Sequence, residues 1–287
     1  MRTKRLGLVG CGEWGKNYIS TIAAMDDVEL IAVCRRTNKR PSGISNDCAF
    51  YTNYETMMDK ERLDGVIAAV SPFEHPSIVL SALKRHLPIL IEKPLALNEK
   101  EMEFLNDYPN AKILINYIHL YADGFMGMTT ALKDKKIKSI KTEHTGSAKD
   151  RGFSSLFDYG THDLSICMKL TGILTPICQT INKEGKEIFN IEMRFGDIPV
   201  YMRVGNGGTH KIRRFETLTD CGTVLYDGNE PALYQADGMA YGYIGPLAKK
   251  PLGTVIEAFI NNQYETQEIL LRTRYIIKTL KEIQAKL

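Results

Sequence analysis

The sequence predicts an α/β protein with a doubly wound parallel sheet at its N-terminus and, after it, an α+β domain with an open, mainly antiparallel sheet. Over roughly the first 115 residues, short apolar runs alternate with amphipathic segments, the pattern of βαβ units around a parallel sheet. Strand-like segments then follow one another with turns between them, which is typical of antiparallel sheets. We therefore expect two domains, residues 1–117 and 118–287.

The first domain is expected to alternate strands and helices from its first residues. Trp14, Tyr18, Ile22 and Met25 recur every three or four residues and predict a helix after the first strand. Residues 75–86 and 98–108 are predicted to form further helices, the second with Asn98 as N-cap and Glu101 in the capping-box position. The strands are predicted at 5–9, 28–34, 65–70, 88–92 and 111–117.

The second domain is expected to combine a run of strands with helices on either side. Helices are predicted near 122–134, after Asp158, and as one long C-terminal helix over about 254–285. The apolar side of that last helix is formed by Ile269, Leu270, Tyr275, Ile276, Leu280 and Ile283. The strands are predicted at 138–144, 187–195, 200–205 and 223–228.

Composition argues against a nucleic-acid-binding, metal-binding or membrane protein. The net charge of +3 is too small to indicate a nucleic-acid partner. The six cysteines form no C-x-x-C pair, so we expect no metal site and a reducing compartment. We see no apolar run of a membrane span's length and no signal-peptide core. The expected location is therefore cytoplasmic, with no membrane partner.

A glycine motif, Gly10-Cys11-Gly12-Glu13-Trp14-Gly15, lies between the first predicted strand and helix. In a G-x-G-x-x-G turn the first glycine permits the tight turn, the second lets a pyrophosphate approach the backbone, and the third lets the helix pack closely. The pyrophosphate then meets free N–H groups at the helix N-terminus. We therefore predict a Rossmann dinucleotide site that includes Gly10, Gly12, Glu13, Trp14 and Gly15; the alternative is a glycine-rich turn without a ligand.

The end of the second predicted strand indicates which dinucleotide binds. An NAD site usually carries a carboxylate there, bonded to the ribose 2′-hydroxyl. This chain has Cys34 followed by Arg35 and Arg36, and two guanidinium groups suit a 2′-phosphate. We therefore predict NADP(H) as the preferred cofactor, with NAD(H) as the alternative; a basic surface loop is the other interpretation.

Two further segments carry candidate catalytic residues. Glu92-Lys93-Pro94 ends an apolar strand, where parallel sheets bind ligands. Asp158 and His162 are four residues apart and would share one face of a helix. A carboxylate beside a histidine can orient it and raise its basicity, as a general base for alcohol oxidation requires. An Asp N-cap with a structural histidine is the alternative.

In order and spacing, G-x-G-x-x-G, E-K-P and D-x-G-x-H-D resemble the glucose-fructose oxidoreductase / inositol dehydrogenase / rhizopine catabolism (Gfo/Idh/MocA) family. The resemblance extends to Ser71-Pro72 with His75 and to Gly172. It implies an NAD- or NADP-binding Rossmann domain and a second domain whose open sheet is often used for oligomerisation, so we expect a homo-oligomer. The implied cofactor-binding residues then also include Ser71, Pro72, His75, Glu92 and Lys93.

The resemblance also implies roles for the candidate catalytic residues. Lys93 would bind substrate near the nicotinamide, His162 would be the general acid/base, and Asp158 would assist it or bind substrate. Many members carry an Arg followed by an aromatic residue where this chain has Leu120 and Tyr121. We therefore expect Asn116, His119 and Tyr121 to shape the substrate pocket instead.

Together these features predict an NADP(H)-dependent oxidoreductase. It would transfer hydride to or from a hydroxyl or ketone carbon of a sugar or nucleotide-sugar, so the expected partner is a small carbohydrate. One alternative is a reductase of a non-sugar substrate, a linear tetrapyrrole or a cyclic imine. The other is a non-catalytic, cofactor-binding regulator, because a fold does not determine function.

Overall fold

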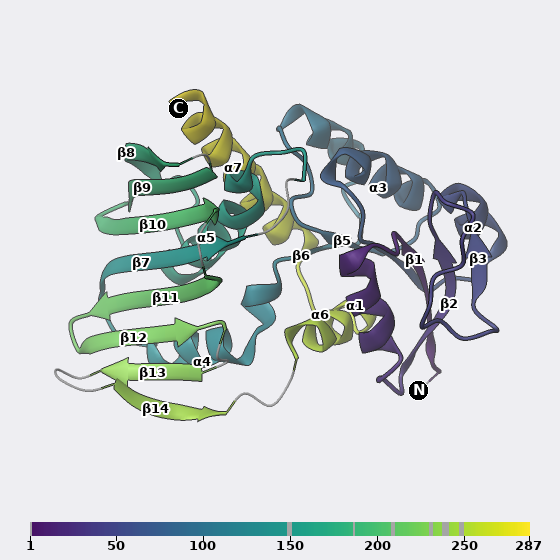
Figure 1. The fold of residues 1–287 in the computed structure, drawn as a ribbon, viewed down its shortest axis with the longest axis horizontal. Helices are drawn as coiled ribbons and strands as arrows, with labels where there is room; N and C mark the ends of the chain where they lie inside the picture. Colours follow the sequence, from purple (N-terminus) through teal and green to yellow (C-terminus); the bar gives the residue numbers. More distant parts are fainter. Residues whose placement is uncertain are drawn as a thin grey trace. The chain divides into compact units, whose positions relative to one another are not determined.

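The computed structural model describes residues 2–147, 151–185, 187–207, 210–229, 232–236, 241–246 and 250–287. In these ranges the chain forms one six-stranded and one eight-stranded sheet (Figure 1). The chain divides into two compact units, Met1–Asn116 with Leu252–Leu270, and Tyr117–Pro251 with Leu271–Leu287. The predicted α/β class, with a parallel and a mainly antiparallel sheet, is confirmed.

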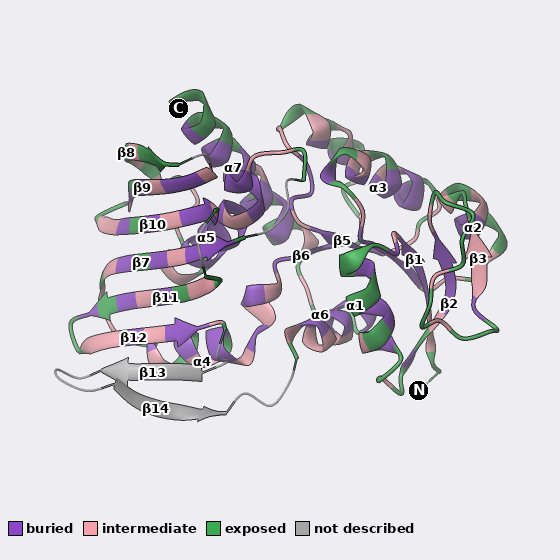
Figure 2. Cartoon of the chain, viewed as in Figure 1, coloured by how far each residue is buried: buried purple, intermediate pink, exposed green. Residues whose placement is uncertain are grey.

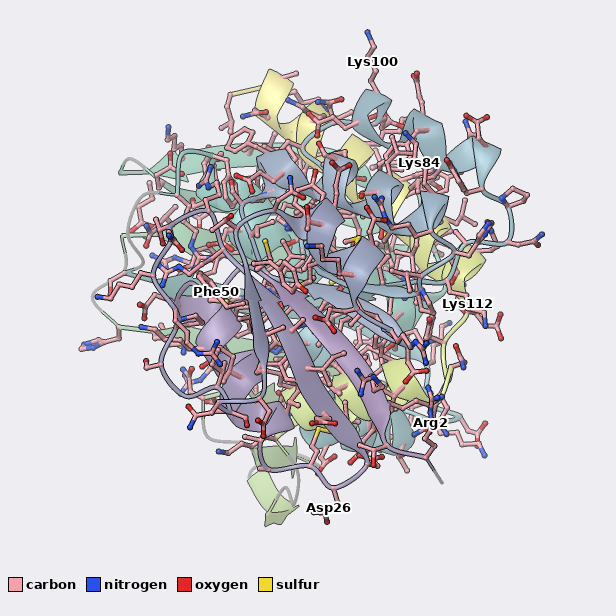
Figure 3. The ribbon with its side chains drawn as sticks, turned by 90° about the vertical axis from the view of Figure 1, so that its right-hand side faces the viewer. Arg2, Asp26, Phe50, Lys84, Lys100 and Lys112 are labelled. Atoms are coloured by element: carbon pink, nitrogen blue, oxygen red, sulfur yellow. The ribbon has the colours of Figure 1, made fainter. Side chains whose placement is uncertain are left out.

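The six-stranded sheet of the first unit is parallel throughout, in the order β3-β2-β1-β4-β5-β6. This order reverses direction between β1 and β4, and ligands bind at such a switch point. In Figure 3 the labelled Arg2, Asp26 and Lys112, each just before a strand, lie along the lower and right-hand side of the view. The strands are β1 Lys4–Val9, β2 Val28–Cys34, β3 Ala49–Tyr51, β4 Gly65–Ala68, β5 Ile89–Glu92 and β6 Ile113–Asn116.

The strands of this sheet form because their residues are apolar on both faces. Every residue of β4, β5 and β6 is buried, as in a parallel sheet covered on both sides. The five predicted strands are all present, each slightly shorter than or equal to its apolar run, except that β1 begins one residue earlier. The prediction missed β3, which has three residues, and α2, which has seven.

Helices connect these strands. They are α1 Glu13–Ile22, α2 Tyr54–Lys60, η1 Pro72–Glu74, α3 His75–Lys84 and η2 Lys100–Asp107. The segment predicted as an α-helix over 98–108 is a 3₁₀-helix. The predicted N-cap is wrong, because η2 has Glu99 and not Asn98 at that position, although Asn98 Oδ1 accepts from Glu101 N at 3.1 Å. The Glu101 carboxylate reaches back to the N–H of Leu97 at 2.8 Å.

The C-terminal segment is two helices, α6 Pro251–Ile260 and α7 Thr266–Ala285, where the sequence predicted one. The break contains Asn262, with a left-handed φ of 52°, a conformation that ends a helix. The Thr266 hydroxyl then bonds both the N–H and the carbonyl of Ile113 in β6. Residues Leu252–Leu270 therefore group with the first unit, although they lie far beyond the expected boundary at 117.

The eight-stranded sheet has the order β14-β13-β12-β11-β7-β10-β9-β8. Only β7 and β10 pair in parallel; the other described pairs are antiparallel. The prediction missed β8, β11, β13 and β14. The strands are β7 Ile137–Gly146, β8 Ile177–Glu184, β9 Glu187–Phe195, β10 Ile198–Asn206, β11 Ile212–Thr219, β12 Gly222–Asp227, β13 Ala232–Ala236 and β14 Tyr241–Pro246.

Helices cover this sheet. The second unit also contains η3 Ile118–Tyr121, α4 Asp123–Ala131 and α5 Ser155–Thr171. Helix α5 packs on β7, β9 and β10, and α4 packs on β12. Burial alternates along the central strands, and β8 at the edge is mostly exposed (Figure 2). Helix α5 is thus held against the sheet, which positions Asp158 and His162. Within the described ranges, no helix has the length and apolarity needed to cross a membrane.

Candidate functional site

The glycine turn has the geometry that a pyrophosphate site requires. Gly10 has a φ of +97°, and a Cβ there would lie 2.3 Å from the Ala69 carbonyl oxygen. A Cβ at Gly15 would lie 2.1 Å from the Gly10 carbonyl oxygen. Nothing lies within 4 Å of a Cβ built at Gly12, which is the N-cap of α1 and provides no side-chain cap. The turn therefore leaves space and free N–H groups for an anionic ligand.

This turn is one wall of a cleft of about 680 Å³ at the carboxyl ends of β1, β2 and β4, a volume typical of ligand sites. Of the predicted cofactor residues, Gly10, Gly12, Glu13, Trp14, Arg35, Arg36 and Ser71 line it. Gly15, Pro72, His75, Glu92 and Lys93 do not. The prediction missed Thr37, Asn53, Tyr54, Phe73, Glu74 and Ser77, which also line the cleft. Several of these follow a strand end, and that position is the signal that could have identified them.

Arg35 and Arg36 carry positive charge into the cleft. Arg35 Nη1 donates to the Lys39 carbonyl at 3.3 Å. Arg36 Nη1 lies 2.9 Å from Glu74 Oε1, a carboxylate of η1. The carboxylate that faces these arginines thus comes from the loop after β4 and not from the end of β2.

Glu92 is the centre of a buried hydrogen-bond network beneath the glycine turn. Its carboxylate accepts from the Trp14 indole N–H, from the Tyr18 hydroxyl at 2.7 Å and from the Asn116 amide at 2.7 Å. Burial raises the pKa of Glu92, while its hydrogen bonds oppose that shift. Glu92 therefore ties α1 to β5 and β6. Asn116, which we expected in the substrate pocket, is a member of this network and is 1% exposed.

His75 is fully buried and supports the turn that contains Lys93. Its Nδ1 lies 2.8 Å from the Pro94 carbonyl oxygen. Burial lowers the pKa of His75 to about 4, so the ring is neutral near pH 7 and its Nδ1–H donates to that carbonyl. Pro72, also buried, begins η1. Both residues therefore shape the loops at the sheet's carboxyl edge.

In the second unit, α5 carries Asp158 and His162 on one face, four residues apart. The N-cap is Ser154, whose hydroxyl accepts from Leu156 N, and Gly172 ends the helix in a left-handed conformation. The alternative of Asp158 as N-cap is therefore wrong. Asp158 Oδ1 accepts instead from Arg151 Nη1 at 3.3 Å. Both Asp158 and His162 are at most 9% exposed.

Three imidazoles lie together in the second unit. The His119 ring is 4.8 Å from that of His162 and 5.3 Å from that of His144, between centroids. His144 Nδ1 is 3.0 Å from Asp163 Oδ1, and both side chains are buried. Among the described residues, these side chains do not form a metal-binding group.

The sequence motifs did not identify His144 or Asp163 as site residues, although Asp163 directly follows His162 in its motif. Burial raises the pKa of the Asp163 carboxyl. The His119 ring lies against the His162 ring, and a role of His119 in a substrate pocket stays a prediction. Tyr121 is half-buried at the end of η3.

Comparison with known proteins agrees with the fold. Residues 4–111 match the family model GFO_IDH_MocA, described as an oxidoreductase family with an NAD-binding Rossmann fold. The chain is 33% identical to the rhizopine catabolism protein MocA of Rhizobium meliloti over 102 residues. That match covers 34% of this chain, and the chain spans 31% of that relative's length.

Two solved structures share the fold over nearly the whole chain. A 3-ketoreductase from Actinomadura kijaniata, in complex with TDP-benzene and NADP, has a TM-score of 0.85 at 14% identity and covers 99% of this chain and 98% of its own. A UDP-N-acetylglucosamine 3-dehydrogenase from Acidithiobacillus ferrooxidans has a TM-score of 0.82 at 15% identity, with coverage of 99% and 98%. The resemblance predicted from the order of motifs is confirmed. Residues 4–111 are thus similar to the NAD-binding Rossmann fold of the Gfo/Idh/MocA oxidoreductase family.

Proposed function

We propose that this protein is an NADP(H)-dependent oxidoreductase that acts on a hydroxyl or ketone carbon of a sugar or nucleotide-sugar. The observation that carries the proposal is the cleft in which an open glycine turn lies near two arginines. The end of β2 offers Arg35 and Arg36 where an NAD site usually has a carboxylate. The 3-ketoreductase with the same fold was solved with NADP, and the other neighbour is named for a nucleotide-sugar.

Residues of both units would bind the cofactor and the substrate and carry the chemistry. The N–H groups from Gly12 to Gly15 would hold the pyrophosphate, and the two arginines would hold the 2′-phosphate. Bound NADP(H) would supply or accept the hydride. Lys93 would stabilise the charge on the substrate oxygen, and His162 would give or take the proton. Asp158 would orient His162 or bind substrate.

Trp14 makes the cofactor assignment directly measurable. It is the only tryptophan of the chain, it lines the cleft and its side chain is partly exposed. A titration of its fluorescence with NADPH, and separately with NADH, therefore reports binding in this cleft. We expect tighter binding of NADPH; tighter binding of NADH would overturn the cofactor assignment, and binding of neither would favour a non-oxidoreductase role.

Substitution of the arginines tests whether they bind the 2′-phosphate of NADPH. We expect Arg35→Ala and Arg36→Ala each to weaken NADPH binding about tenfold or more, because a charge-assisted bond to phosphate contributes roughly 1.5–3 kcal/mol. NADH binding should change less than about twofold, since it lacks that phosphate. Lys60→Ala removes an exposed positive charge outside the cleft lining and serves as the control. Equal losses for both cofactors would contradict the assignment.

A further inference from the structure

We propose that the substrate carries an anionic group, a phosphate or a carboxylate, and that Arg213 binds it. The inference rests on the proposed function and specifies the chemical class of its substrate. It adds a binding residue in the second unit that the sequence motifs do not contain.

Arg213 extends from the sheet beside the cluster formed by His119, His144 and His162. In β11 it is the register partner of His144 in β7. It lies two residues from Phe215 and so points to the same face of the sheet. The Phe215 ring is fully buried, 5.6 Å from the His119 ring and 6.3 Å from the His144 ring. Arg213 therefore shares a face of the sheet with His144, whose ring lies 5.6 Å from that of His162 in α5.

The guanidinium of Arg213 has no counter-ion in the part of the chain that the structure describes. Its Nε is buried without a hydrogen-bond partner, and none of the ion pairs found there includes it. Neighbouring arginines differ: Arg214 pairs with Asp227 at 3.0 Å, and Arg203 pairs with Glu143 at 3.1 Å. Arg213 is half-buried, and a charge that is partly removed from water without an ion-pair partner is costly. A bound anion would supply that partner.

The electrostatic surroundings favour an added anion. Lys211 lies two residues before Arg213, and repulsion by Arg213 is the main cause that lowers the pKa of Lys211. Burial lowers the pKa of Arg213 itself. Asp158 acts on Arg213 electrostatically, but Asp158 already accepts a hydrogen bond from Arg151. A bound anion would relieve this repulsion.

Gly228 packs against the stem of the Arg213 side chain. A Cβ at Gly228 would lie 3.3 Å from the Arg213 Cβ and 3.4 Å from the Tyr226 hydroxyl, so a larger side chain would crowd this position. The planar guanidinium fork matches the paired oxygens of phosphate or carboxylate. A neutral sugar hydroxyl would leave the charge uncompensated.

Binding of matched probes tests the proposal. The full-length protein, saturated with its nicotinamide cofactor, is titrated by calorimetry with glucose, glucose 6-phosphate, UDP-glucose and glucuronate. We expect at least one anionic probe to bind about tenfold or more tightly than glucose. A gain for the two phosphate probes identifies a phosphate site, and a gain for glucuronate alone identifies a carboxylate site. Anionic probes that bind no more tightly than glucose overturn the proposal.

Two variants assign the effect to Arg213. Arg213→Gln should lose about tenfold in affinity for the anionic probe, and Arg213→Lys should lose less because it keeps the charge without the fork. Arg214→Gln is the matched control, on the same strand but the opposite face, and should stay within about twofold. Equal losses in the two Gln variants overturn the assignment.

The Trp14 titration separates this result from the cofactor proposal. Arg213→Gln should bind NADPH like the wild type, which also shows that the variant is folded. If the wild type binds neither cofactor, the proposed function fails. The probe titration is then made without cofactor and still decides whether Arg213 binds an anion.

Discussion

At the scale of single residues, the candidate site depends on buried polar groups whose partners are determined by the fold. Glu92 accepts from three side chains, His75 supports the Pro94 carbonyl, and Asp163 binds His144. Each such group is costly to bury unless it is hydrogen-bonded. These contacts therefore hold the turn and the helix that carry the proposed catalytic residues.

His75 gives the protein a stability that depends on pH. Its pKa is about 4 in the folded protein, because of burial, and 6.5 is the ordinary value. A base whose pKa is lowered on folding contributes stability above pH 6.5, and this is lost as the pH falls towards 4. Between pH 7 and pH 5 we expect a loss of about 2 kcal/mol from this residue.

Urea unfolding at pH 7 and at pH 5 measures that loss. His75→Gln should be less stable than wild type at pH 7 but should lose about 2 kcal/mol less on acidification. His86→Asn is the control, because His86 is exposed and asparagine tolerates its left-handed φ of 56°. The same pH response in wild type and His75→Gln would exclude His75 as its source.

At the scale of elements, the glycine turn and α1 place two different demands on their glycines: one must allow close packing, and the other must leave space for a ligand. Gly15 allows α1 to pack on the turn, and Gly12 leaves the space above it open. The sequence predicted both requirements because the motif is local and lies between a strand and a helix. It did not predict β3, β8, β11 or the 3₁₀ form of η2, because short or half-exposed segments carry weak periodic patterns.

The two glycines should therefore respond differently to alanine. Gly15→Ala places a Cβ 2.1 Å from a backbone oxygen and should cost about 2 kcal/mol or more in unfolding free energy. Gly12→Ala meets no atom within 4 Å and should stay within about 1 kcal/mol of wild type. The second variant should nevertheless bind NADPH about tenfold more weakly, because the Cβ occupies the pyrophosphate space.

Thermal unfolding and the Trp14 titration, made on both variants, check this pair. If Gly12→Ala binds NADPH as the wild type does, the pyrophosphate is not held above Gly12. If Gly15→Ala is as stable as the wild type, the turn relaxes to admit the methyl group.

At the scale of the whole molecule, the chain returns to its first unit near the C-terminus. Phe259 in α6 packs on Gly65 of β4, where a Cβ would lie 2.8 Å from the ring. Thr266 bonds the backbone of β6. The first unit is thus completed by residues more than 130 positions after β6.

Removal of the Phe259 ring should destabilise the protein strongly. The side chain is 3% exposed, and Phe→Ala in a core costs about 3–5 kcal/mol because it leaves a cavity. Ile177→Ala, at a residue that is 71% exposed, should stay within about 0.5 kcal/mol. Urea unfolding of both variants measures the difference, and a small effect of Phe259→Ala would show that α6 is not part of this core.

The sequence by itself determined the features that arise from residues close together along the chain. Apolar runs predicted the five longer strands of the parallel sheet, the glycine motif predicted the turn, and the spacing of Asp158 and His162 predicted their shared helix face. Only the tertiary structure decided the partners of Glu92, the contact of His144 with Asp163, and the position of Arg213 opposite His144. Tyr18 and Glu92, for example, are 74 residues apart. Such contacts depend on strand order and register, which local periodicity does not encode.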